Sequence, residues 1–165
     1  MGPMRVYLTG SDGDAQAAVA DWLRRRHGFA RVALSGGPLD AQRMRGGDSV
    51  RAAALALEHG DRQASLVIDG VRTTAEAEYL RARGVLGVRV AARLLRSEQP
   101  DGLAGDAPEV DVATVPVDLV LLPFREPLAH DRDLRLLVAR LAVLHATRAM
   151  AVRVPQSTRG VRQGR

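Results

Sequence analysis

Short runs of apolar residues alternate along this chain with longer segments whose apolar residues recur every three to four positions. Five runs have the length of strands, at residues 5–8, 29–34, 65–69, 85–92 and 117–122. Runs that are apolar throughout are typical of parallel strands buried on both faces. The segments between them predict helices. The alternation therefore predicts an α/β fold, a three-layer, doubly wound parallel sheet of five strands.

Turn and helix signals divide the chain further. Residues 4–150 are predicted to form one domain, because the length suits a single core and no internal repeat is present. Residues 97–116 are rich in Pro, Gly and Asp, which predicts a lid-like or disordered loop. Residues 151–165 have no apolar period and predict a flexible basic tail.

The charge is distributed unevenly. All 24 basic residues are arginine, and the formal net charge is +5. Residues 1–145 carry 19 arginines and 19 acids, whereas residues 146–165 carry five arginines and no acid. The excess charge therefore lies in the tail, where it predicts at most weak nucleic-acid contact. Aromatic residues that would stack on bases are absent from the tail.

Several kinds of site are excluded by composition. The chain has no cysteine, so a thiolate metal site is impossible and a cytoplasmic protein is expected. The four histidines have no metal-binding spacing, so no metal site is predicted. No apolar run reaches the roughly 20 residues of a membrane span, so no membrane contact is predicted.

Residues 5–20 predict a short strand, a glycine-containing turn and the first turns of a helix. This geometry places backbone N–H groups and the positive helix end around a phosphate. The phosphate-loop pattern is G-x-x-x-x-G-K-[ST], whose lysine reaches the outer phosphates and whose hydroxyl holds magnesium. Gly10 fits the first position, but Ala15, Gln16 and Ala17 replace the second glycine, the lysine and the hydroxyl. A strand-to-helix turn also contains glycine for purely geometric reasons.

A second informative stretch is the apolar run that ends at Asp69. Arg72 follows it, and Arg93 and Arg96 follow the next predicted strand. Ligands bind outside the carboxyl ends of the strands in a doubly wound sheet. We therefore expect these side chains and the loop at Gly10 to lie at one edge of the sheet.

Two stretches resemble a known family. Residues 8–20 (LTGSDGDAQAAVA) are similar to the phosphate loop of the dephospho-coenzyme A kinase and deoxynucleoside monophosphate kinase branch of the P-loop kinases, close to L-T-G-x-x-G-S-G-K-S-T-V-A. Residues 67–80 (VIDGVRTTAEAEYL) resemble the V-I-D-G-[IV]-R-x-x-x-E-x-E-[FY]-L stretch of that branch. The resemblance covers residues 4–145 and implies a P-loop nucleotide kinase fold, with ATP and Mg as cofactors if the protein is active.

The resemblance also implies roles for individual residues. The candidates for nucleotide binding are Gly10, Ser11, Asp12, Gly13, Asp14, Ala15, Gln16 and Ala17. The candidates for catalysis are Asp69, which follows the core strand, Arg72, which approaches the phosphoryl acceptor, and the lid arginines Arg93 and Arg96.

The departures from the family pattern predict impaired catalysis. Phosphoryl transfer depends almost entirely on positioning and electrostatic stabilisation, so losing the lysine and the magnesium-binding hydroxyl is expected to cost several orders of magnitude in rate. Asp12 and Asp14 add negative charge that opposes a triphosphate. The predicted function is a degenerate kinase-like protein that binds a nucleotide or phosphate ligand or a macromolecular partner, with Asp69 and Arg72 as remnants that pair with each other.

Two alternatives remain open at this stage. The first is an active (deoxy)nucleoside monophosphate or dephospho-coenzyme A kinase in which Arg72, Arg93 or Arg96 supplies the missing charge and Asp69 holds magnesium. The second is a nucleic-acid-associated protein that uses the basic tail.

Overall fold

The chain forms one five-stranded sheet in the computed structural model, which describes residues 3–34, 49–60, 64–91, 114–122 and 127–153. The strands are β1 (Arg5–Thr9), β2 (Ala30–Ala33), β3 (Leu66–Val71), β4 (Leu86–Val90) and β5 (Leu119–Leu121). Their order is β2-β3-β1-β4-β5, and every neighbouring pair is parallel. The predicted parallel, five-stranded sheet is therefore confirmed, with β1 at its centre.

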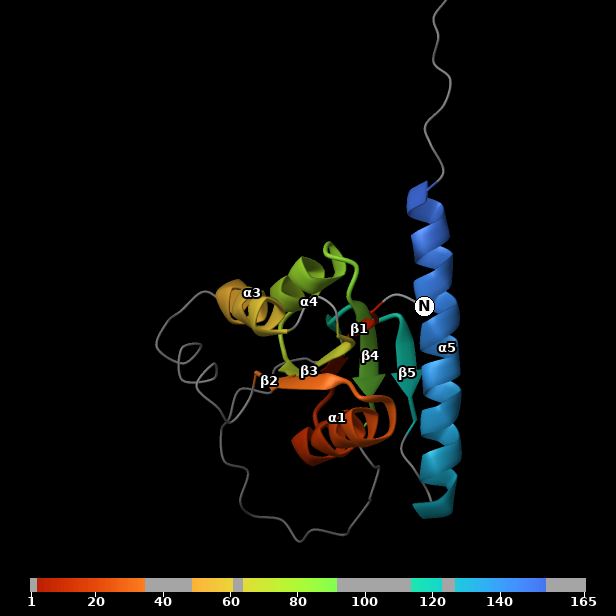
Figure 1. Ribbon diagram of the computed structural model, residues 1–165. Helices are drawn as coiled ribbons and strands as arrows, with labels where there is room; N and C mark the ends of the chain where they lie inside the picture. The colour runs from red at the N-terminus through yellow and green to blue at the C-terminus, as the bar shows by residue number, and fades with distance from the viewer. Residues whose placement is uncertain (1–2, 35–48, 61–63, 92–113, 123–126, 154–165) are drawn as a thin grey trace, which may run out of the picture.

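Helices cover both faces of the sheet. They are α1 (Gly13–His27), α3 (Ser49–His59), α4 (Thr74–Arg81) and α5 (Pro127–Arg153). Figure 1 shows α1 on one face and α3 with α4 on the other, while α5 stands beside β5. Alternate residues of β1 serve the two cores: Val6 and Leu8 pack with side chains of α1 and α5, and Tyr7 packs with those of α3 and α4. This arrangement confirms the three-layer, doubly wound architecture.

The ends of the helices follow from local chemistry. The side chain of Asp12 caps the N-terminus of α1, and Gly28 ends the helix in the left-handed conformation with φ 68°. Arg24, Arg25 and Arg26 lie in its last turn, where positive charge is favourable.

The strands differ from their predicted bounds by one or two residues at one or both ends, and three differences change the description of an element. Strand β3 continues beyond Asp69 to Val71, so that acid lies within the strand and not after it. Strand β5 is shorter than residues 117–122. Helix α5 reaches Arg153 and so includes the first residues of the predicted tail. Residues 97–113 of the predicted loop, and residues 154–165, lie outside the described part of the chain.

A carboxylate near the start of β5 ties three elements together. The side chain of Asp118 accepts hydrogen bonds from the Gly87 N–H at 2.7 Å, from Arg148 Nη2 at 2.6 Å and from Arg81 Nη2 at 3.2 Å. Because these donors belong to β4, α5 and α4, Asp118 fixes the start of β5 relative to β4 and to two helices.

None of the described helices combines the length and the apolar character needed to cross a membrane.

Candidate functional site at the carboxyl ends of the strands

The loop from β1 to α1 passes close to the neighbouring strand. Gly10 has φ 154°, and a Cβ atom at this position would collide with the carbonyl oxygen of Val90 at the end of β4. A residue without a side chain is therefore required here. The glycine serves the local backbone path, whether or not a phosphate binds.

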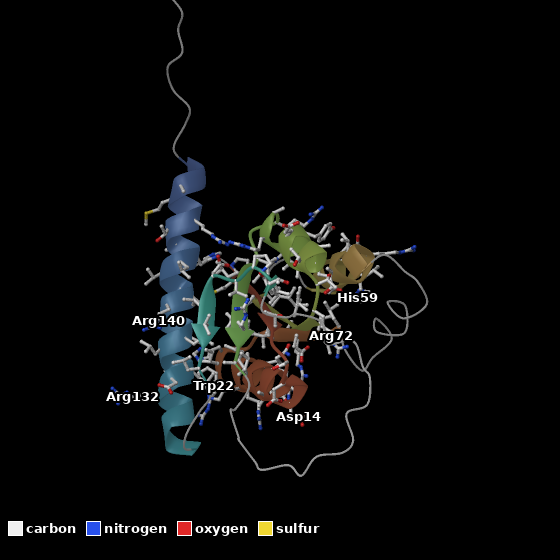
Figure 2. All side chains as sticks on the ribbon, turned by 180° about the vertical axis from the view of Figure 1, so that it is seen from behind. Asp14, Trp22, His59, Arg72, Arg132 and Arg140 are labelled. Carbon is white, nitrogen blue, oxygen red and sulfur yellow. The ribbon has the colours of Figure 1, made fainter. Side chains whose placement is uncertain are left out.

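The N-terminus of α1 is capped by the chain itself. Asp12 Oδ1 accepts the backbone N–H of Ala15 at 2.9 Å, and the Asp12 carbonyl oxygen accepts that of Gln16 at 3.2 Å. Asp14 lies exposed in the first turn (Figure 2). A carboxylate thus occupies the end of the helix at which a phosphate loop would hold a phosphate oxygen.

Gln16, at the position of the phosphate-loop lysine, points into the protein. Its side chain is only 4% exposed. The amide nitrogen donates to the Gly10 carbonyl oxygen at 2.8 Å, and the amide oxygen accepts from the Gly70 N–H at 3.2 Å. One side chain therefore connects the loop after β1 to the end of β3.

The position of the Gly70 N–H, the donor on β3, depends on a break in the strand register. Tyr7 lies opposite Ile68, but Thr9 lies opposite Val71, so β3 contains an extra residue. Gly70 in this bulge has φ 84°, a conformation that glycine adopts without strain. The bulge brings the N–H of Gly70 to the amide oxygen of Gln16.

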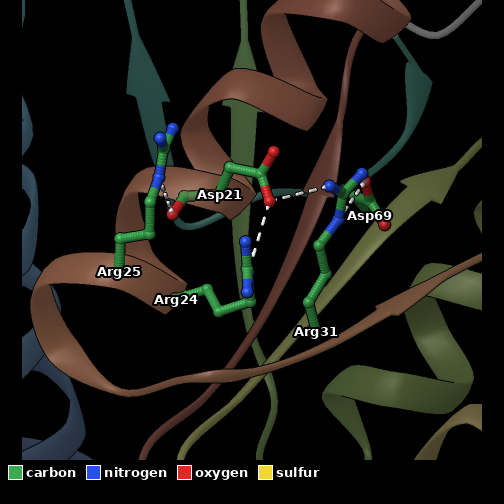
Figure 3. Close-up of polar contacts among 5 residues, drawn as sticks. All are labelled: Asp21, Arg24, Arg25, Arg31 and Asp69. Atoms are coloured by element: carbon green, nitrogen blue, oxygen red, sulfur yellow. Dashed lines mark hydrogen bonds and ion pairs between the residues drawn. The ribbon is translucent and has the colours of Figure 1, made fainter.

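Asp69 lies beside this bulge and forms an ion pair with an arginine of β2. Its Oδ2 accepts from Arg31 Nη2 at 2.6 Å and from Arg31 Nε at 3.2 Å, while Asp21 of α1 accepts from Arg31 Nη1 at 3.0 Å (Figure 3). Arg24 approaches Asp21 from the same helix. The side chain of Asp69 is 8% exposed, so this carboxylate is neutralised inside the protein.

The charges of this network reinforce one another. Partial burial works against the charged form of Arg31, but its hydrogen bonds and proximity to Asp69 and Asp21 prevail and raise its pKa. Burial also works against the charged Asp21, but Arg31 and Arg24 together lower the pKa of that carboxyl. Arg31 and Asp21 therefore stay ionised near neutral pH.

Arg72 takes no part in this network among the described residues. Its side chain is exposed at the end of β3 (Figure 2), and its backbone N–H donates to Glu76 Oε2 at 3.0 Å. The predicted pairing of Asp69 with Arg72 was wrong, since Asp69 pairs with Arg31. Arg93 and Arg96 lie outside the described residues, so their predicted roles stay predictions.

The residues present do not fit a magnesium triphosphate. Ala17 offers no hydroxyl ligand, Gln16 is turned inward, and the Asp69 carboxylate is held by Arg31. Ser11 and Gly13 are exposed at the loop, but Asp12 already occupies the helix end. Among the described residues, no group of three histidines or acids lies close enough to hold a metal ion.

Sequence reasoning missed Arg31 and Asp21. Arg31 lies between Ala30 and Val32 in a short edge strand, and a single charge flanked by apolar residues was the only signal of a paired side chain. Asp21 looked like an ordinary surface acid of a helix. The contact of Arg31 with Asp69 depends on the order of the strands, which the alternating pattern does not predict.

Comparison with known proteins gives the fold. No family model matches the sequence, and no curated protein matches it. Among solved structures, a gluconokinase from Sinorhizobium meliloti 1021 is similar, with a TM-score of 0.55 and 15% sequence identity over 90% of this chain and 97% of that chain. The kinase branch suggested by the two motifs stays a prediction. The parallel sheet, its central strand–loop–helix unit and this likeness show that the chain has the P-loop kinase fold.

Proposed function

We propose that this chain is a catalytically impaired protein with the P-loop kinase fold, which acts by binding a macromolecular partner and not by transferring a phosphoryl group. The observation that supports the proposal is the buried Gln16 amide, bonded at one end to Gly10 and at the other to Gly70. The segment at the position of the phosphate loop then holds the end of β1 against the end of β3.

The electrostatics of the loop support the same proposal. In an active phosphate loop, a lysine and a magnesium ion offset the charge of the phosphates. Here the corresponding positions carry a neutral amide and a methyl group, and Asp12 and Asp14 bring negative charge to the helix end. A triphosphate would have to displace the Asp12 cap and meet repulsion from Asp14.

A phosphate-containing ligand is a second candidate, favoured by one observation. Arg72 is exposed at the carboxyl end of a central strand, where ligands of doubly wound sheets bind. An arginine at this place suits a nucleoside monophosphate. Such a ligand would use the acceptor side of the kinase fold without its donor side.

Calorimetric titration with ATP, with and without magnesium, tests the proposal. We expect no binding that strengthens when magnesium is added. Nucleoside monophosphates and dephospho-coenzyme A are then titrated: binding of one of these, lost in Arg72→Ala, would favour the second candidate. Magnesium-dependent ATP binding together with turnover would contradict both.

Restoring the loop gives a sharper comparison. The variant Ala15→Gly/Gln16→Lys/Ala17→Ser reintroduces the pattern, and Ala15→Gly/Gln16→Met/Ala17→Ser is its uncharged control. We expect the lysine variant to bind ATP at least tenfold more tightly than the control, because the missing charge is the main defect of the loop. If the unaltered protein bound ATP as tightly as the lysine variant, the proposed impairment would be wrong.

A further inference from the structure

Helix α5 is apolar on two opposite faces. Leu134, Leu137 and Leu141 are buried in the core shared with α1. On the outer face, Leu136, Val143 and Met150 are 49%, 66% and 68% exposed. A helix that is apolar on both sides usually has a partner on each side. In the described structure only the inner face has one.

The exposed residues form a regular stripe. The large residues of the stripe recur every seven positions, at Leu136, Val143 and Met150. An alanine follows the first two of them after three residues, at Ala139 and Ala146, which is the spacing of the two seam positions of a heptad. Large and small side chains therefore alternate along a seam about 20 Å long. A seam of this kind accepts another helix whose large side chains fit above the alanines.

The strand edge beside the helix extends this apolar surface. Strand β5 is the last of the sheet, and Val120 and Leu122 are 49% and 71% exposed. A hollow of about 180 Å³ lies between this edge and the helix, with Leu136 and Arg140 in its lining. The apolar stripe is therefore continuous with an open strand edge.

We propose that a second copy of this chain covers the stripe, with the two α5 helices antiparallel and the two-fold axis close to Val143. Heptad spacing then sets Leu136 of one copy against Met150 of the other, and Val143 against its own counterpart. Such an interface is self-complementary, as the symmetry of a homodimer requires.

The charges along α5 favour this direction. Arg132, Arg135 and Arg140 are exposed on the first half of the helix, and Figure 2 shows Arg132 and Arg140 projecting away from the sheet. Residues 141–147 contain no arginine and no acid. About an axis at Val143, an antiparallel pair sets Arg140 of one copy opposite Ala146 of the other, and Arg135 opposite Ala151, so these arginines do not face one another. A parallel pair would bring arginines together, which is unfavourable.

Sedimentation equilibrium of the full chain between about 1 and 100 µM tests the pairing. We expect a dimer whose dissociation constant rises at least tenfold in Val143→Glu. The matched control is Ala149→Glu, an exposed position of α5 outside the stripe, which leaves the dimer unchanged. Because Val143 is exposed, circular dichroism of the variant shows an unchanged fold. A monomer at every concentration, or a dimer that survives Val143→Glu, overturns the proposal.

Cysteine cross-linking tests the direction, since the chain has no cysteine of its own. Under mild oxidation, Val143→Cys forms a disulfide-linked dimer. Leu136→Cys and Met150→Cys cross-link when mixed, but neither cross-links alone. Cross-linking of Leu136→Cys with itself indicates parallel helices and overturns the antiparallel arrangement. A monomeric Val143→Cys variant whose introduced thiol resists maleimide indicates cover by another segment of the same chain, which also overturns the proposal. These outcomes are independent of ATP binding.

Discussion

The Gln16 side-chain amide hydrogen-bonds to the backbone of Gly10 and of Gly70. Gly10 lies 6 residues before Gln16 in the sequence, and Gly70 lies 54 residues after it. In Gln16→Ala the half-buried Gly10 carbonyl loses this donor, and the buried Gly70 N–H loses this acceptor. We expect the free energy of unfolding to fall by about 1 to 3 kcal/mol, the net contribution of two such hydrogen bonds. Urea denaturation measures it. Glu78→Ala, at an exposed position of α4, is the control and is expected to change stability by less than about 0.5 kcal/mol. Equal losses in the two variants would show that the Gln16 bridge does not stabilise the fold.

Tyr7 is completely buried, and its hydroxyl donates to the carbonyl oxygen of Pro116. Burial raises the pKa of this phenol from 10.0 to about 12, opposed by the charge of Arg81. The folded protein therefore holds the proton more tightly than the unfolded chain between these two pH values. The stability that depends on the proton is complete below pH 10 and is lost as the pH rises toward 12.

This shift predicts how Tyr7→Phe differs from the unaltered protein. At pH 9 the variant is expected to be about 1 kcal/mol less stable, because it lacks the hydrogen bond to Pro116. By pH 11 the gap closes, since the unaltered protein loses about 1.4 kcal/mol for each pH unit above the unfolded pKa, and the phenylalanine has no proton to lose. Urea denaturation at both pH values measures the gap. A gap that is the same at pH 9 and pH 11 would contradict the raised pKa.

The sequence predicts which residues stand at the loop but not where their side chains point. The phosphate-loop pattern identifies Gln16 as the replacement of the lysine, and this much follows from spacing alone. Its inward direction depends on the bulge at Gly70, which exists only once β3 has paired with β1. For the same reason Arg31, and not Arg72, holds Asp69: the neighbouring strand determines the partner of this acid.

At the scale of an element, the N-terminus of α4 can be predicted from the local sequence alone. Thr73 Oγ1 accepts the N–H of Glu76 at 3.2 Å, and the Glu76 carboxylate accepts the N–H of Thr73 at 3.1 Å, which is the capping box that a threonine followed three residues later by a glutamate predicts. Because all these atoms belong to four consecutive residues, no knowledge of the fold was needed to predict the contact.

Thr73→Ala removes this cap. We expect it to lower the free energy of unfolding by about 0.5 to 2 kcal/mol, the usual cost of losing an N-cap. Thr74→Ala is a matched control one residue later, at an exposed helical position, and is expected to be nearly neutral. Thermal unfolding of both variants followed by circular dichroism makes the comparison. If Thr74→Ala proved as damaging as Thr73→Ala, the loss would not be due to the cap.

Helix α5 and strand β5 show the limit of pattern reasoning for elements. The spacing of Leu134, Leu137 and Leu141 predicts a helix from its buried face alone, because one apolar face is the usual signal. The second apolar face, with Leu136 and Val143, blurs that period and concealed how far the helix extends. In β5 the apolar run is longer than its paired part, because only Leu119–Leu121 pair with β4.

At the scale of the whole molecule, the alternation of apolar runs and helical segments was enough to predict the layers, but not the order of the strands. Strand β1 lies between β3 and β4 in the sheet, although β2 follows it in the chain. That order brings the loop at Gly10, the bulge at Gly70 and the end of β4 together at one edge. Convergence at the carboxyl edge was predicted from the parallel sheet, and the partners within it required the strand order.

The predicted nucleic-acid contact of the basic tail is tested on the whole molecule. Because α5 continues to Arg153, a truncation after that residue keeps the helix intact and removes Arg159, Arg162 and Arg165. Three cations that contact duplex DNA give a slope of log affinity against log salt of about −2.7, so affinity falls about 40-fold between 50 and 200 mM salt. Fluorescence anisotropy with a labelled duplex measures this. We expect weak binding by the full chain, and none by the truncated chain or by the full-length control with all three arginines changed to glutamine. If the truncated chain kept both the affinity and the slope, the contact would lie on the folded part of the protein and not on the tail.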